Sequence, residues 1–494
     1  MSLLGLLLVA PSTWCNPLPL PDYPVGRFAR SVTNGDPLDQ SPLWLLGHKE
    51  QYRELADPTM MVHEGGWYLY PSCDMAWVSK DHGATWQHTP ISIEGQKEGY
   101  RDLGYAPTVE RHGNQFLLVA SDSALYVADS PLGPFKPLGK IALPSRPDIP
   151  PPVDPALFSD QDGRLYYYWG CTATNGIWGV ELDAKAPTKL IGQPRKLLAP
   201  DTTKFPWEAL GEWNQNRAVT WMEGAWMFRH GDTYYLTYSA AGTENKTYAI
   251  GCYTGRSPLG PFTPQQKNPI VRQTDGLITG TGHGSFYQDP DGQIWCVYTV
   301  RASVAHGFER RIGMDRAEID SQGELWVPEV TSFPQWVSGH PPQGAPFATG
   351  WVPLNDSLHV EVSSSAPNLP GRFAVDDSLR TWWQPDGQDA TPTLTLSLIA
   401  KSTLHAVRVI WRDIGLNTNK GVNPGPFRYH VDVETAPGQW TTVVDQTHNE
   451  TDLLIDYREC PPVSGDKIRL VVTGWPKGIT PGIVQFTPFG VAGK

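Results

Sequence analysis

The feature that most constrains this fold is a hairpin pattern that recurs five times in the first two thirds of the chain. Each copy has a short start, an apolar strand, a turn with glycine and an aromatic-rich strand, and the copies begin at residues 57, 106, 154, 223 and 283. Their spacing fits one four-stranded propeller blade per copy, with insertions between some blades. The repeat therefore predicts a five-bladed β-propeller over residues 21–333.

The first copy illustrates the pattern. Residues 57–62 (DPTMMV) precede a predicted turn at Gly65-Gly66, and residues 67–70 (WYLY) form the second strand. The whole chain contains 48 Gly and 47 Pro, which would interrupt helices too often for them to dominate. The predicted fold class is therefore all-β.

The blade pattern stops after Asp315, and a second domain follows. Residues 334–353 are rich in Pro and Gly and predict a linker that packs across both domains. From residue 354 short alternating strands return, for example residues 393–398 (TLTLSL) and 406–410 (AVRVI). This alternation predicts a β-sandwich over residues 354–494.

Charge and composition exclude several kinds of partner. The net charge is −12 without any basic run, so a nucleic-acid partner is not expected. No stretch reaches the ~18–20 apolar residues that cross a bilayer. Residues 1–20 resemble a signal segment, so a secreted or periplasmic protein is expected, with surface anchoring through Cys15 left open.

The six cysteines show no CxxC spacing, which argues against a zinc site. We expect free thiols buried in strands, with disulfides as the alternative that export would allow.

Three of the five copies begin with a carboxylate: Asp57, Asp154 and Glu223. Innermost propeller strands line a central channel, so equivalent starts should converge at one mouth. Three acids in one place repel each other and raise at least one pKa. Such a set can supply the protonated acid and the ionised base of glycoside hydrolysis. Each acid alone could instead be an ordinary turn residue.

Four segments resemble glycoside hydrolase family 43, a family of five-bladed propeller glycosidases. They are residues 56–60 (ADPTM), 153–158 (VDPALF), 222–227 (MEGAWM) and 280–286 (GTGHGSF). The resemblance implies that Asp57 is the general base, Glu223 the general acid and Asp154 the residue that tunes the pKa of the acid and orients it. It also implies inversion of configuration.

Other residues are candidates for substrate binding. The resemblance implies that His283 lies near the axis, where a structural calcium could bind through water. It also implies that residues 310–315 (RRIGMD) supply an arginine to the pocket; Arg311 is the candidate, and a plain salt bridge is the alternative for it. Trp207 and Trp221, with Trp213, lie in the longest insertion and are predicted to stack on sugars or to fill the core. No cofactor is expected for the chemistry itself.

Residues 373–385 (FAVDDSLRTWWQP) resemble the discoidin or coagulation-factor type C fold, also called carbohydrate-binding module family 32. The resemblance implies a jelly-roll sandwich that acts either as a structural buttress or as a glycan tether.

Together these features predict a monomeric, exo-acting, inverting hydrolase of plant or algal oligo- or polysaccharides. The expected products are terminal α-L-arabinofuranosyl or β-D-xylosyl residues. Alternatives are a β-galactofuranosidase or exo-galactanase with the same mechanism, a fructan-active or anhydrogalactose-active relative, and a non-catalytic carbohydrate-binding propeller.

Overall fold

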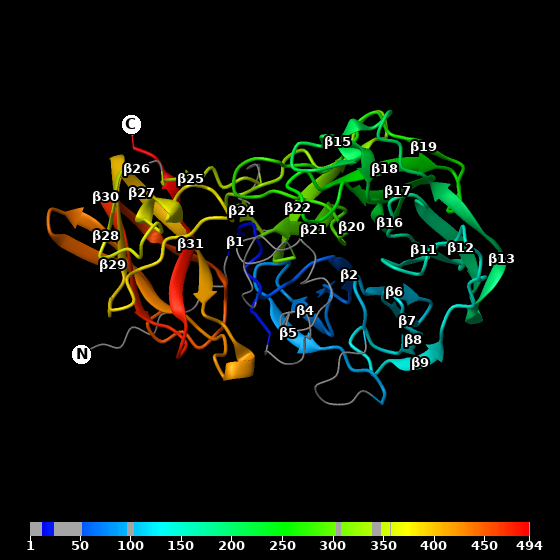
Figure 1. The fold of residues 1–494 in the computed structure, drawn as a ribbon, viewed down its shortest axis with the longest axis horizontal. Coiled ribbons are helices and arrows are strands. Elements are labelled where there is room, and N and C mark those ends of the chain that lie inside the picture. Colours follow the sequence, from blue (N-terminus) through cyan, green and yellow to red (C-terminus); the bar gives the residue numbers. More distant parts are fainter. Residues whose placement is uncertain are drawn as a thin grey trace.

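The computed structural model describes residues 12–23, 52–95, 103–302, 308–337, 347–355 and 357–493. Figure 1 shows two β domains side by side, a propeller coloured from blue to green and a sandwich coloured from yellow to red. The predicted all-β fold class, a five-bladed propeller followed by a sandwich, is confirmed. Among the described residues no helix is long and apolar enough to span a membrane.

Each blade is a meander of four antiparallel strands in chain order. The first two blades are β2 (Thr59–His63), β3 (Gly66–Tyr70), β4 (Met75–Ser79), β5 (Gln87–Pro90), and β6 (Thr108–His112), β7 (Gln115–Val119), β8 (Leu125–Ala128), β9 (Lys136–Gly139). The third is β10 (Ala156–Ser159), β11 (Leu165–Trp169), β12 (Ile177–Asp183), β13 (Ala186–Leu198). The last two are β16 (Glu223–His230), β17 (Thr233–Ala240), β18 (Ala249–Gly255), β19 (Phe262–Pro264), and β20 (Gly284–Gln288), β21 (Ile294–Arg301), β22 (Arg310–Ile319), β23 (Leu325–Trp326).

The longest insertion lies between the third and fourth blades. It contains the 3₁₀ helix η3 (Pro206–Glu208) and a small hairpin of β14 (Ala209–Leu210) and β15 (Asn216–Thr220). This hairpin leads directly into β16, the innermost strand of the fourth blade.

The hairpin between β2 and β3 shows why the turns recur. His63 pairs with Gly66, and the two residues between them, Glu64 and Gly65, have φ values of 49° and 77°. Two consecutive positive φ angles define the type I′ turn that matches the twist of the flanking strands. The turn residues are therefore Glu64-Gly65, one position before the predicted pair.

The five innermost strands, β2, β6, β10, β16 and β20, form a closed ring in which β20 returns to β2. Hydroxyl groups link neighbouring blades: Thr59 Oγ1 donates to the carbonyl of Pro107 at 2.8 Å, and Ser285 Oγ donates to the carbonyl of Pro58 at 3.2 Å. The second bond joins the last blade to the first, so side chains help to close the ring.

The N-terminal segment 12–23 lies between the two domains (Figure 1). Its β1 (Thr13–Trp14) pairs with β24 (Gln335–Trp336). Asn16 accepts a bond from the amide of Met314 and donates one to its carbonyl, both at 2.9 Å. Of the predicted signal-like segment, residues 1–11 lie outside the described residues, while residues 12–20 are largely buried in the fold.

The sandwich is built from β25 (Val352–Pro353), β26 (Ser357–Val362), η4 (Gly371–Ala374), β27 (Thr393–Ile414), η5 (Thr418–Lys420), β28 (Arg428–Ala436), β29 (Gln439–Asp445), β30 (Ile455–Gly474) and β31 (Thr480–Val491). Register shifts bend the long strand β27, so its first half pairs with β26 and its second half with β31. Buried side chains around Trp383 fill the core.

The described ends of the predicted linker pack against both domains. Trp351 stacks on His405 of the sandwich with ring centroids 4.7 Å apart, and the carbonyl of Trp336 accepts a hydrogen bond from Arg316 Nη2 of the propeller at 2.9 Å. All six cysteines are free thiols, as expected, but only Cys252, Cys296 and Cys460 lie in strands, and Cys171 and Cys460 are only partly buried.

We predict that Asn16→Ala destabilises the protein, because it leaves the buried amide and carbonyl of Met314 without their partner. A loss of about 1–3 kcal/mol in the free energy of unfolding is expected, measured by urea denaturation. The exposed Asn216 is the control, and Asn216→Ala should change stability by less than about 0.5 kcal/mol. Equal effects of the two substitutions would contradict the role of Asn16.

Candidate active site

Four blade starts share one backbone conformation. The residue at each start has a positive φ, and its amide donates to a hydroxyl group of the preceding blade at 2.7–3.0 Å. The pairs are Asp57 with Thr299, Ala106 with Ser72, Asp154 with Ser121, and His283 with Ser239. These turns aim the start residues at the propeller axis, as predicted for Asp57 and Asp154.

Glu223 does not occupy the equivalent position. In the fourth blade Gly224 has the positive φ, 61°, and Glu223 stands one residue earlier, before a bulge that separates it from Trp226. A Cβ atom on Gly224 would lie 3.0 Å from the ring of His283, so any other residue there would push against that ring. The predicted equivalence therefore holds for two acids and is wrong for the third, although all three are buried near the axis.

Asp57 is held by an arginine and a serine. Its Oδ1 accepts from Arg310 Nη1 at 2.8 Å, and its Oδ2 accepts from Ser72 Oγ at 2.7 Å. His283 Nδ1 lies 3.3 Å from Oδ1. Both donors suit an ionised carboxylate, which can only accept hydrogen bonds.

Arg310 lies between two acids. Its guanidinium donates to Asp57 and to Glu54 Oε1, and it also reaches Thr243 Oγ1 at 3.0 Å. Burial lowers the pKa of Arg310, but the charges of Asp57 and Glu54 raise it by more than burial lowers it. The arginine therefore stays charged.

The predicted place of Arg311 in the pocket is wrong, and its alternative, a plain salt bridge, is what the structure shows. Neighbouring side chains on a strand point to opposite faces, and on β22 Arg310 faces the site while Arg311 faces the boundary between the domains. There Arg311 Nη2 lies 3.5 Å from Asp22 Oδ1.

Glu223 accepts hydrogen bonds on both oxygens. Trp221 Nε1 donates to Oε2 at 2.8 Å, and the thiol of Cys171 lies 3.2 Å from the same oxygen. The hydroxyl of Tyr248 donates to Oε1. The hydrogen bonds to Glu223 thus come from Trp221, Cys171 and Tyr248, whereas those to Asp57 described above come from Arg310 and Ser72.

Among the described residues Asp154 forms no ion pair with an arginine. Burial raises its pKa to about 7; His283 opposes the increase, the charges of Glu223 and Asp57 add to it, and the charge of Arg310 is a further influence that lowers it. Its Oδ2 lies 3.8 Å from His283 Nδ1. The site therefore contains one acid paired with a cation and another that retains a proton near neutral pH.

Asp154, Glu223 and His283 bring potential ligand atoms within 4.8 Å of one another. Calcium prefers about six to eight oxygen ligands, whereas this group offers two carboxylates and one ring nitrogen. The three side chains thus do not suit calcium as a complete set of direct ligands. The predicted calcium would need to bind largely through water.

The two predicted tryptophans differ. Trp207 is 6% exposed and packs against Tyr238 in the hydrophobic core, so its predicted place at the substrate is wrong. Trp221 is 38% exposed and bonds to Glu223, so its ring borders the site. Trp213 is 74% exposed, with Lys246 Nζ 3.6 Å above its ring.

Several residues of the site were not predicted: Arg310, Tyr248, Cys171, Ser72 and Glu54. Arg310 lies in the segment 310–315 that was predicted to supply an arginine. The choice between Arg310 and Arg311 depended on which face of the strand points to the site. Tyr248 lies just before β18 and Cys171 just after β11, at strand ends that point to the axis. No motif marks either of them.

Comparison with known families agrees with this geometry. The model for glycosyl hydrolases family 43 matches residues 52–325, more than half of the chain. The model for a NedA-like, galactose-binding domain matches residues 373–470 of the sandwich.

Individual relatives are more distant. The chain is similar to a beta-D-galactofuranosidase of Aspergillus niger, with 28% identity over 36% of this chain and 46% of that protein. It is similar to a beta-xylosidase of Xylanibacter ruminicola, with 28% identity over 32% and 54%. The chain thus spans about half the length of these two relatives. A solved thermostable family-43 glycoside hydrolase has 27% identity, covers 57% of this chain and 95% of that chain, and has a TM-score of 0.48.

The two tryptophans provide a matched pair of substitutions. Trp221→Phe removes the hydrogen bond to Glu223 Oε2, and we expect about a tenfold loss of turnover at unchanged stability. Trp207→Phe leaves space in the core, and we expect a loss of about 1–3 kcal/mol in stability with little change in turnover. Kinetics and thermal unfolding of both variants check this, and a reversed pattern would contradict the assignment.

Asp154 makes stability depend on pH. The pKa of Asp154 is about 7 in the folded protein and has the ordinary value of 3.8 in the unfolded chain. Folding therefore favours the protonated carboxyl, and this contribution to stability is lost as the pH rises toward 7. Asp154→Asn should therefore raise the melting temperature at about pH 8 and change it little at about pH 4. Melting curves across this range test the prediction. An equal shift at both ends would contradict it.

Proposed function

The chain belongs to glycosyl hydrolase family 43, and from this premise we propose that it hydrolyses glycosidic bonds in a single, inverting displacement. The observation that carries the proposal is the separate set of donors around Asp57 and Glu223. Inversion requires one carboxylate to act as base and another to act as acid, with roughly 6.5–9.5 Å between them for water.

In the proposed mechanism Asp57 is the general base. Arg310 and Ser72 hold its carboxylate in place, and it takes a proton from the water that attacks the anomeric carbon. Glu223 is the general acid and gives its proton to the oxygen of the leaving group. Trp221, Tyr248 and Cys171 fix the orientation of Glu223.

Asp154 supports the acid. Two nearby carboxylates do not ionise independently, and the charge of Glu223 contributes to the raised pKa of Asp154. When Asp154 ionises, its charge in turn favours a proton on Glu223. The role of Asp154 is thus to help the acid retain its proton until the glycosidic bond breaks.

The proposed substrates are polysaccharides or oligosaccharides with terminal α-L-arabinofuranosyl or β-D-xylosyl residues, cleaved in an exo manner. Relatives named beta-xylosidase and xylosidase/arabinosidase support this choice. A relative named beta-D-galactofuranosidase supports the alternative sugar. Release of internal oligomers from a long polymer, rather than monosaccharide, would contradict the exo mode.

Location, calcium, oligomeric state and glycan binding are part of the same proposal. The signal-like start of the sequence supports secretion or export to the periplasm. We further propose a monomer, with any calcium at the axis bound through water beside His283. The NedA-like, galactose-binding match supports sugar binding by the sandwich, which calorimetry of the full-length protein with arabinan, xylan and galactan fragments would test.

The first experiment combines substrate choice with stereochemistry. Nitrophenyl arabinofuranoside, xyloside, galactoside and galactofuranoside are offered to the protein, and NMR identifies the anomer that forms first. We expect cleavage of the arabinofuranoside or the xyloside with an inverted anomer. A retained anomer would contradict the roles of Asp57 and Glu223, and binding without cleavage would favour a non-catalytic propeller.

The second experiment separates acid from base. Glu223→Gln should lower kcat/KM about 10²–10⁴-fold on an unactivated oligosaccharide, but much less on a nitrophenyl glycoside, because nitrophenolate leaves without a proton. Asp57→Asn should lower it on both substrates, since both need activated water. The control Asp162→Asn removes an exposed acid in a blade turn and should leave kcat/KM unchanged. Identical profiles for Glu223→Gln and Asp57→Asn would contradict the separate roles.

A further inference from the structure

Five charged side chains meet where the propeller contacts the sandwich. Arg53 Nη1 lies 2.6 Å from Asp452 Oδ2, and Arg53 Nε lies 3.1 Å from Asp413 Oδ2. Asp22 Oδ1 lies 3.7 Å from Arg53 and 3.5 Å from Arg311. The side chain of Arg53 is 1% exposed. Three acids from two other parts of the chain thus surround one buried arginine of the propeller.

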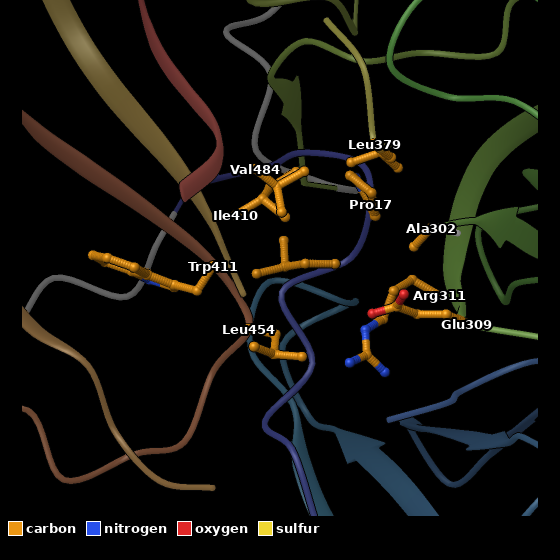
Figure 2. A pocket seen from close by; sticks show the side chains of 10 residues that line it. Pro17, Ala302, Glu309, Arg311, Leu379, Ile410, Trp411, Leu454 and Val484 are labelled. Carbon is orange, nitrogen blue, oxygen red and sulfur yellow. The ribbon is translucent and has the colours of Figure 1, made fainter. Parts of the chain in front are cut away.

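The backbone closes the same boundary. The amide of Asp22 donates to the carbonyl of Asp452 at 2.8 Å, and the amide of Leu454 donates to Asp22 Oδ2 at 3.0 Å. Figure 2 shows the neighbouring cavity, with Arg311 on the propeller side, Leu454 on the sandwich side and Pro17 of the N-terminal segment nearby. Its volume is about 20 Å³, room for about one water molecule. The cavity beside Arg311 therefore has no room for a sugar, whereas a cleft of about 530 Å³ opens on the other side of Asp22 and Asp452.

This boundary is one residue away from the active site. Arg53 contacts the sandwich, and the next residue, Glu54, accepts hydrogen bonds from Arg310. Arg310 in turn donates to Asp57 at 2.8 Å. The amide of Leu55 donates to the carbonyl of Arg310 at 3.0 Å, so segment 52–57 lies against the start of β22. Because successive side chains point to opposite faces, Arg53 and Arg311 point to the domain boundary, whereas Glu54 and Arg310 point to Asp57.

Burial makes this connection stiff. A buried guanidinium cannot leave its carboxylates without exposing an uncompensated charge to a low dielectric, which is strongly unfavourable. Arg53 therefore has one arrangement while Asp413 and Asp452 are in place. Because Glu54 is the next residue, the position of its backbone is fixed together with that of Arg53, and its carboxylate accepts a hydrogen bond from Arg310.

We propose that Arg53, held by Asp413 and Asp452 of the sandwich, is a positioning residue for Asp57, so that the sandwich domain sets the geometry of the proposed base. The inference rests on the proposed function for the role of Asp57. It assigns to the second domain a part in turnover that is separate from any glycan binding.

The test uses the full-length chain with Asp413→Asn and Asp452→Asn, separately and together. Each substitution keeps the shape and removes one charge, and each single variant leaves Arg53 with the other acid. Crystal structures should show the distance from Arg310 Nη1 to Asp57 Oδ1 increasing beyond about 3.5 Å. With a substrate that the wild type cleaves, kcat should fall about tenfold to a hundredfold, while KM changes by less than about twofold.

Asp432→Asn is the matched control. Asp432 is also buried in the sandwich and accepts from Arg469 Nε at 2.8 Å, on strand β28. We expect this variant to lose thermal stability and to keep kcat. Asp452→Glu keeps the charge and should restore most of the kcat that Asp452→Asn loses.

The outcomes separate the two proposals. An unchanged Arg310–Asp57 contact with unchanged kcat in the folded single variants would overturn the positioning role. An equal loss of kcat in Asp432→Asn would also overturn it, because general destabilisation would then explain the effect. If the wild type cleaves no glycoside but the contact still lengthens, the proposed function fails and the positioning of Asp57 stands.

Discussion

The arrangement of the site depends on one backbone interaction, the bond from the amide of a blade's first residue to a hydroxyl of the preceding blade. This bond joins neighbouring blades and holds the first residue at positive φ, a conformation that is costly for side chains other than glycine. Ala106 adopts it as well, with φ 50°, although its methyl group has no chemistry to perform. The turn is therefore a property of the ring, and the acids use positions that the ring already provides.

The repeat allowed much of this to be predicted. Asp57 and Asp154 were identifiable because an Asp-Pro pair precedes a strand in both copies, and a blade start must lie at the axis. The offset of Glu223 could not be predicted, because a bulge changes the backbone without leaving a motif. The adjacent pair Arg310 and Arg311 shows the same limit. On a strand, a shift of one residue exchanges the two faces, and sequence alone does not set the register.

Contacts between distant segments were beyond prediction for a different reason. Trp207 and Trp221 lie in the same insertion, and only tertiary packing decides that one fills the core while the other borders the site. Asn16 belongs to the segment that composition marks as signal-like, and Asp22 follows it, yet both are buried between domains. Nothing local in the sequence reveals that they contact β22 and the sandwich.

The buried charges explain why the acids of the site can differ in role. Asp57 forms an ion pair with Arg310, whereas Asp154 feels that arginine only at longer range and has a pKa of about 7 because of its burial. Identical side chains thus acquire different protonation through their neighbours. The arginine that makes this difference is itself held by Glu54, whose neighbour Arg53 is surrounded by acids of the sandwich and of the N-terminal segment. The ion pairs of the site, Asp57 with Arg310 and Arg310 with Glu54, are thus linked through the backbone of residues 53–54 to the ion pairs that Arg53 forms with the second domain, where each buried charge again has a partner.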